Sequence, residues 1–237
     1  MPVVSRLSTT PVKGTALHSR TRVELTRNGV EENRRFHLVD ARHRLINGKQ
    51  QGPLVRVSAD DDADRHHLSL RLPGREPVEG TTTSLGEPVV TTLYGGDVPG
   101  HLVEGPWASA LSEFVGEPVH LVATDAPGAG VDLHPVTLVS TATIEHLSTA
   151  TDCGEAVDHR RFRMLVEVDG CDVREEDTWA GRRVRLGAAT VRMLPQDPTS
   201  TVARLPEEKG VVLGMYAIVE EPGTIAVGDR VEVVDPG

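Results

Sequence analysis

Short segments in which apolar and polar residues alternate recur along the first half of the chain. Turn-forming residues separate these segments at intervals of roughly 10 to 15 residues. Alternation with a period of two is typical of strands that bury one face, and its repetition predicts an antiparallel barrel or sandwich. The segments with this pattern are residues 22–25, 36–39, 54–57, 68–72 and 89–93.

The end of the chain carries the same pattern in its clearest form. Two runs rich in β-branched residues, 214–219 and 224–234, are interrupted by Pro222-Gly223 and Gly228-Asp229. Because these dipeptides favour turns, the region predicts strand, turn and strand at the closing edge of a barrel.

Two segments instead place apolar residues at helical spacing. Residues 107–115 predict a short amphipathic helix that ends at Gly116. Residues 141–150 predict a second helix after a strand at 136–140, with Ser140 or Thr141 as its N-cap. The aspartate-rich run 60–64 predicts a solvated turn, because charge runs are usually exposed.

A segment rich in glycine and alanine, 125–130, separates the two helices and predicts a link between domains. We therefore expect a mainly β protein with a few short helices and two domains, 1–125 and 126–237. A chain of 237 residues is long enough to bury a substantial core in this arrangement.

Composition excludes several functional classes. A formal net charge of -10 argues against nucleic acid as a partner, and no stretch of 18 apolar residues predicts a membrane span. The beginning of the chain lacks the apolar core of a signal peptide. Two cysteines, Cys153 and Cys171, are too few to cross-link a chain of this size, so we expect a cytoplasmic protein with reduced thiols.

Common catalytic motifs are missing from the sequence. It contains no Gly-x-Ser-x-Gly elbow and no glycine-rich phosphate loop. His66 and His67 are adjacent, so on a strand they face opposite sides, and they do not have the spacing of a zinc site. In so acidic a chain, any anion site must be a local cluster of Arg and Lys side chains.

Several motifs occur in an order that resembles one family. The first part of the chain contains Thr-Pro-Val-Lys-Gly at 10–14 and Asn-Arg-Arg-Phe-His-Leu-Val-Asp at 33–40. The second part contains Glu-Glu-Asp-Thr-Trp at 175–179 and the Pro-Gly-Thr-Ile…Val-Gly-Asp-Arg-Val ending. Together they resemble the MOSC proteins, named for the C-terminal domain of molybdenum-cofactor sulfurase. The resemblance implies an N-terminal β-barrel domain packed on a MOSC β-barrel domain.

The resemblance also implies an activity. Similar proteins include the mitochondrial amidoxime-reducing component and bacterial reductases of N-hydroxylated bases. These proteins bind a molybdopterin cofactor and reduce N–O bonds with electrons from a redox partner. No fused redox domain occurs here, so the resemblance implies an electron donor in trans. The substrate would be a small nitrogenous, N-oxygenated molecule or a sulfur-containing one.

In the family, basic residues of both domains hold the phosphate of the pterin. The resemblance places Lys13, Arg35 and Arg163 at these positions, in a cleft between the two barrels. Fixed cations suit a phosphomonoester, because Arg binds its oxygens in a bidentate manner. The other residues that the resemblance assigns to cofactor binding are Lys49, Arg161 and Thr199.

The metal-ligand motif of the family is altered in this sequence. Thr199 and Ser200 stand where an Arg-Cys pair is expected, and no cysteine follows Cys171. A thiolate is a soft, strongly donating ligand, whereas a hydroxyl must lose a proton of much higher pKa to donate as an alkoxide. Ser200 or Asp197 would then be the metal ligand and part of the catalytic site, if a metal is held at all.

His134 and Asp132 lie in a stretch that borders the cofactor pocket in relatives, and either residue is a candidate proton donor or base. Three functions stay open. The first is a molybdenum-cofactor enzyme with a changed ligand. The second is a metal-free enzyme of a specialised biosynthetic pathway that uses the inherited anion pocket. The third is a non-catalytic carrier of the cofactor.

Overall fold

The computed structural model describes residues 1–46, 51–150, 158–196, 203–204 and 212–234. The chain divides into two compact units, which do not follow a single cut in the sequence. Unit 1 consists of residues 1–8, 19–30 and 133–237. Unit 2 consists of residues 9–18 and 31–132. The predicted mainly β fold with a few short helices is confirmed.

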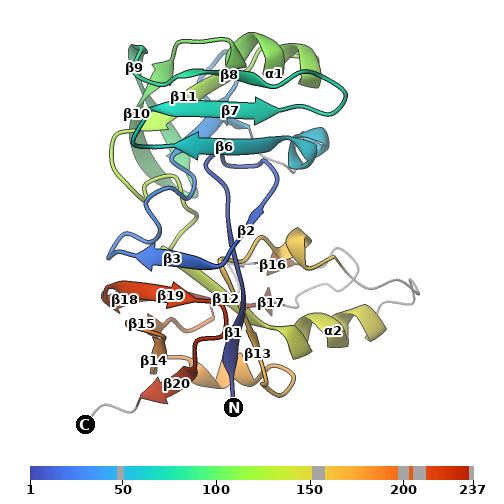
Figure 1. The fold of residues 1–237 in the computed structure, drawn as a ribbon, viewed down its shortest axis with the longest axis vertical. Coiled ribbons are helices and arrows are strands. Elements are labelled where there is room, and N and C mark those ends of the chain that lie inside the picture. The colour runs from blue at the N-terminus through green and yellow to red at the C-terminus, as the bar shows by residue number, and fades with distance from the viewer. Residues whose placement is uncertain (47–50, 151–157, 197–202, 205–211, 235–237) are drawn as a thin grey trace. The chain divides into compact units, whose positions relative to one another are not determined.

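Unit 1 contains an eight-stranded sheet in the order β2-β1-β13-β12-β18-β15-β14-β20 (Figure 1). From β1 to β20, neighbouring strands run antiparallel, except β12 and β13, which run parallel. A bridge between Val3 and Arg230 also joins β1 to the β20 end, and the Val4 amide donates to the Asp229 carbonyl at 2.8 Å. The sheet therefore curls until its two ends meet.

The strands and helices of unit 1 have the following bounds: β1 Val3–Thr9, β2 His18–Arg20, β3 Arg22–Leu25, β12 Val136–Ser140, α2 Thr141–Ala150, η2 His159–Phe162, β13 Val166–Asp169, η3 Glu175–Trp179, β14 Arg183–Leu186, β15 Ala189–Met193, β16 Ala203–Arg204, β17 Val212–Leu213, β18 Met215–Glu221, β19 Gly223–Ala226 and β20 Val231–Val234.

The alternation that predicted strands also explains the core of unit 1. Val184 and Leu186 of β14 and Val191 and Met193 of β15 are fully buried in one apolar cluster. The second helix begins as expected, because the Ser140 hydroxyl accepts a hydrogen bond from the Thr143 amide at 3.1 Å. The predicted N-cap at Ser140 is therefore confirmed.

Unit 2 contains a five-stranded sheet in the order β5-β4-β11-β10-β9 and a three-stranded sheet in the order β6-β7-β8. Trp107 and Leu111 of α1 are fully buried in the apolar cluster of this unit, as the helical spacing predicts. The elements of unit 2 are β4 Phe36–Val39, β5 Leu45–Ile46, η1 Gly52–Arg56, β6 Ser58–Asp62, β7 His67–Arg71, β8 Val78–Thr81, β9 Leu85–Leu93, β10 Gly96–Val103, α1 Trp107–Val115 and β11 His120–Thr124.

Two local predictions were wrong. Residues 54–57 lie mostly in a 3-10 helix, η1, whose start is favoured by Pro53 in its first turn. Residues 60–62 belong to the strand β6, which pairs with β7, and only the following residues form the turn. Asp61 is fixed on this strand by an ion pair that the charge run alone does not reveal.

No helix among the described residues has the length and apolar character needed to cross a membrane.

Candidate functional site

Lys13 is a buried cation of unit 2 that is held from three sides. Its Nζ atom lies 2.6 Å from Asp132 Oδ1 and 2.9 Å from the Gly130 carbonyl oxygen, and 5.2 Å from the ring centre of Tyr94. An ammonium group has three N–H donors, so these partners account for its bonding capacity. The backbone amide of Lys13 donates a hydrogen bond to the Phe36 carbonyl of β4 at 2.8 Å. Lys13 therefore connects the segment around Asp132 to the five-stranded sheet.

Arg34 completes this cluster. Its backbone adopts a left-handed conformation, with φ of 59°, and its Nη1 atom lies 2.7 Å from Asp132 Oδ2. Burial alone would raise the pKa of Asp132, but the charges of Arg34 and Lys13 hold this pKa well below its ordinary value. Both carboxylate oxygens are engaged, so Asp132 is a weak proton acceptor, and the cluster of Lys13, Arg34 and Asp132 keeps one net positive charge.

His37 is a buried histidine beside this cluster that sequence reasoning missed. Its Nε2 atom lies 2.9 Å from the Thr91 hydroxyl, and the side chain is fully buried. Burial and then the charge of Lys13 lower the pKa of His37 to about 4. The alternation of residues along β4 could have identified His37 as a separate site. Phe36 and Leu38 face the apolar cluster, so the side chain of His37 must face the other way.

Arg35, the second predicted cation of unit 2, has a separate environment. Its Nη1 atom lies 2.7 Å from Asp61 Oδ2, and its guanidinium carbon lies 5.3 Å from the ring centre of Phe36. Burial raises the pKa of Asp61, against the opposing charge of Arg35. A guanidinium has five donors, and the side chain is 29% exposed. Among the described residues, only Asp61 takes a hydrogen bond from it.

The other two predicted cations belong to unit 1, at the end of the short helix η2. Arg163 caps this helix in a left-handed conformation, with φ of 55°, and its side chain is half-buried. Arg161 is exposed, and no ion pair joins it to another described residue. A cleft shared by Lys13, Arg35 and these two residues remains a prediction.

His134 lies in unit 1 beside Tyr216, with ring centres 5.3 Å apart in an edge-to-face arrangement. Burial lowers its pKa, so the imidazole is neutral at pH 7. The carbonyl oxygen of Tyr216 accepts a hydrogen bond from the Leu194 amide at 2.8 Å. His134 is thus connected through Tyr216 to the strand end that leads to the altered ligand motif.

Another polar contact lies just after the end of β15, at Gln196. Gln196 Nε2 donates to Asp177 Oδ1 at 2.7 Å, and Asp177 Oδ2 lies 2.5 Å from Arg174 Nη2. Burial raises the pKa of Asp177, against the charge of Arg174. Asp177 belongs to the family motif at 175–179 but was not assigned a role from the sequence, and Gln196 carries no signal apart from its position shortly before the altered ligand motif.

The described residues do not fit a thiolate-bound molybdenum. Burial and the nearby acids Glu175 and Glu176 raise the pKa of the Cys171 thiol to about 12, so it stays protonated at neutral pH. Within the described ranges, no group of three or more His, Cys, Asp or Glu side chains is arranged to hold a metal ion. The predicted residues Asp197, Thr199, Ser200 and Lys49, like Cys153, lie outside the described residues.

Comparison with known families identifies the fold. Residues 1–118 match the MOSC N-terminal beta barrel domain, and residues 125–232 match the MOSC domain. The chain therefore belongs to the MOSC-domain proteins. MOSC domains are associated with proteins that bind the molybdenum cofactor.

Two solved structures are similar to the chain. The YUAD protein from Bacillus subtilis is 12% identical, with 100% of this chain and 98% of that chain covered and a TM-score of 0.45. A Bordetella bronchiseptica protein, known from its solution structure, is 15% identical, with 42% of this chain and 77% of that chain covered and a TM-score of 0.31. No curated protein matches the chain.

Proposed function

We propose that this protein is a metal-free MOSC-fold enzyme that binds a small phosphorylated or acidic molecule and acts on it by proton transfer. The observation that carries the proposal is the state of Arg35. Its guanidinium is anchored by Asp61 and Phe36, yet it is partly exposed and retains donors for a ligand. An anchored guanidinium binds an anion at a low cost in side-chain entropy.

Among the predicted residues of unit 1, His134 is the candidate proton acceptor. Its lowered pKa keeps the imidazole neutral at pH 7, and only a neutral imidazole accepts a proton. Asp132 is the less suitable of the two predicted residues, because both of its oxygens are bound to buried cations. Its part is to fix Lys13 and Arg34 rather than to exchange protons.

The proposal is tested by identifying what the purified protein retains. Mass analysis of small molecules released on denaturation should detect an anionic ligand from the wild-type protein. Arg35→Gln should release at least about tenfold less, since a charge-assisted bidentate contact contributes roughly 1.5–3 kcal/mol. Arg56→Gln, at an exposed arginine of the same unit, is the matched control. Equal release from wild type and Arg35→Gln would exclude Arg35 as the anchor.

Family membership favours a second function, a molybdenum-cofactor enzyme with an oxygen ligand. In that case Ser200 or Asp197 would hold the metal, and the bound cofactor would supply the redox chemistry with electrons from a donor protein in trans. Stoichiometric molybdenum in protein from a cofactor-competent host would support this second function. The substrate would then be the small N-oxygenated or sulfur-containing molecule expected from the family.

A further inference from the structure

Glu167 is a buried acid in unit 1 that neither function above uses. It lies on β13 between Val166 and Val168, which are fully buried in the apolar cluster of this unit. Because side chains alternate along a strand, Glu167 points to the opposite face. Its side chain is nevertheless only 6% exposed. A buried carboxylate is costly unless it is paired, so its partners indicate its role.

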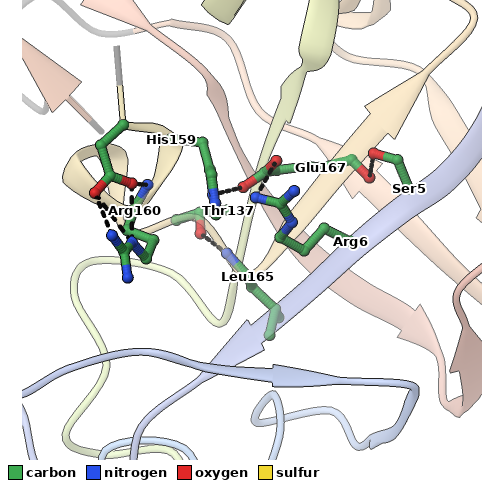
Figure 2. Close-up of polar contacts among 8 residues, drawn as sticks. Ser5, Arg6, Thr137, His159, Arg160, Leu165 and Glu167 are labelled. Carbon is green, nitrogen blue, oxygen red and sulfur yellow. Dashed lines mark hydrogen bonds and ion pairs between the residues drawn. The ribbon is translucent and has the colours of Figure 1, made fainter. Parts of the chain in front are cut away.

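Two basic side chains contact Glu167, as Figure 2 shows. His159 Nδ1 lies 2.8 Å from Oε1, and Arg6 Nη1 lies 3.6 Å from Oε2. A carboxylate can only accept a hydrogen bond, so Nδ1 of His159 carries the hydrogen and donates it. In the neutral imidazole the lone pair must then lie on Nε2, which is the basic atom.

The backbone of η2 holds this imidazole in place. Asp158 caps the short helix, because its side chain accepts a hydrogen bond from the Arg160 amide at 3.0 Å. Phe162 anchors the other end of the helix in an apolar cluster that includes Val139 of β12. His159 therefore contacts Glu167 from a turn whose backbone is held at both ends (Figure 2).

The side chain of His159 is partly exposed in the part of the chain that the structure describes. The side chain is 30% exposed, and its one polar contact among the described residues is the one through Nδ1. The charge of Arg160 is balanced by Asp158 at 2.7 Å, whereas Arg161 is exposed and has no ion pair with a described residue. The charge of Arg161, two residues from His159, makes the surroundings favourable for an anionic molecule.

We propose that His159 and Glu167 form a proton-accepting dyad, in which Nε2 of His159 takes a proton from a small anionic substrate. A bond forms between Nε2 and the proton as the bond between the proton and the substrate breaks. The imidazolium that results keeps its Nδ1 hydrogen on Glu167, whose negative charge stabilises it. Loss of the Nε2 proton to water or to the product restores the base, and no electron transfer takes place. The dyad does not depend on the function proposed above.

A purely structural pairing of η2 with β13 predicts different behaviour, and a labelling experiment separates the two. Diethyl pyrocarbonate acylates unprotonated histidine nitrogens, and mass spectrometry of peptides gives the rate at each histidine. His67 is the matched control, because its Nε2 lies 3.6 Å from Glu79 at an exposed pair and its side chain is 40% exposed. At a pH well above the ordinary pKa of histidine, a dyad labels His159 faster than the more exposed His67, because the carboxylate makes Nε2 more nucleophilic, whereas ordinary accessibility gives the reverse order.

Two variants and one probe complete the experiment on the full-length protein. Glu167→Gln should slow the labelling of His159 by about tenfold, because a neutral amide makes the opposite ring nitrogen less nucleophilic than a carboxylate does, and leave His67 unchanged. Glu79→Gln should leave His159 unchanged. Inorganic phosphate, as the probe anion, should protect His159 but not His67.

Several results would overturn the proposal. Labelling of His159 no faster than His67 in the wild type would identify the pair as structural only. The same conclusion follows if Glu167→Gln, with an unchanged circular dichroism spectrum, labels His159 at the wild-type rate. Absence of protection by phosphate would refute the anionic substrate. If Glu167→Gln unfolds, long-range ¹H–¹⁵N spectra of the wild type determine which ring nitrogen of His159 carries the hydrogen. A hydrogen on Nε2 instead of Nδ1 contradicts the dyad.

Discussion

Two carboxylates, the half-buried Asp132 of unit 2 and the buried Glu167 of unit 1, each contact two basic groups, yet they differ in what they can do. Asp132 of unit 2 is bound by Lys13 and Arg34 at 2.6 and 2.7 Å. Glu167 of unit 1 is bound by His159 at 2.8 Å and more loosely by Arg6 at 3.6 Å. The partners of Asp132 are a lysine and an arginine, whereas one partner of Glu167 is a histidine, the residue type that serves most often as a general base.

The comparison indicates that a carboxylate with basic partners can stabilise the fold or take part in proton transfer, depending on which residues those partners are. A carboxylate between two permanent cations is fixed in its charged state, as the strongly lowered pKa of Asp132 indicates. A carboxylate beside an imidazole orients that imidazole and stabilises its protonated form. We therefore assign Asp132 to the architecture of its unit and Glu167 to a reactive pair.

The largest effect is expected from Asp132→Asn. It leaves the buried charges of Lys13 and Arg34 without their counter-ion, which typically costs about 3–5 kcal/mol of unfolding free energy. Urea unfolding at pH 7 measures this loss. Asp125→Asn, at an exposed aspartate that pairs with His101, is the control and should cost under roughly 1 kcal/mol. Equal effects of the two substitutions would show that the Asp132 cluster is not a stabilising element.

The second-largest effect is the contribution of His37 to the pH dependence of the unfolding free energy. Its pKa of about 4 in the folded state lies below the ordinary value of 6.5, so the unfolded chain binds a proton more readily. Stability should therefore be complete above pH 6.5 and fall by about 3 kcal/mol as the pH decreases to 4. His37→Gln should remove this part of the pH dependence, measured by urea unfolding across that range.

The exposed His66→Gln is the control for this series, and its stability should follow the wild-type pH curve. A His37→Gln curve parallel to that of the wild type would contradict the assignment of His37 as a buried neutral imidazole.

A smaller loss is expected from Glu167→Gln. The amide keeps the size of the side chain and an acceptor for His159 Nδ1, and Arg6 is partly solvated, so we expect a loss of about 1–2 kcal/mol. Thermal unfolding measures it beside Asp132→Asn. A cost equal to that of Asp132→Asn would mean that Glu167 is a structural counter-ion of the same kind, and the contrast between the two carboxylates would disappear.

Much of the fold could be predicted from the sequence. The alternating segments, both helices and the end of the chain carry local signals that depend on nearby residues, and the ordered motifs are sufficient for the family. The segments 54–57 and 60–62 were misjudged for a local reason. Pro53 favours the first turn of a helix, and an ion pair with Arg35 brings Asp61 into a strand.

The site was less predictable, because its chemistry depends on partners that are distant in the sequence. Lys13 was identified by its motif, but its contact with Asp132 joins residues more than a hundred positions apart. The contact between Arg6 and Glu167 also joins residues that are far apart in the sequence. No spacing rule within one segment indicates such pairs, so a sequence can suggest which residues are charged but not which charges are already neutralised.

The ratio of molybdenum to protein tests the central claim most directly, namely that this MOSC-fold protein acts without bound molybdenum. The full-length chain would be expressed in a host that makes the cofactor, purified, and analysed by inductively coupled plasma mass spectrometry. We predict molybdenum far below one atom per chain. One atom per chain, retained through gel filtration, would contradict the account.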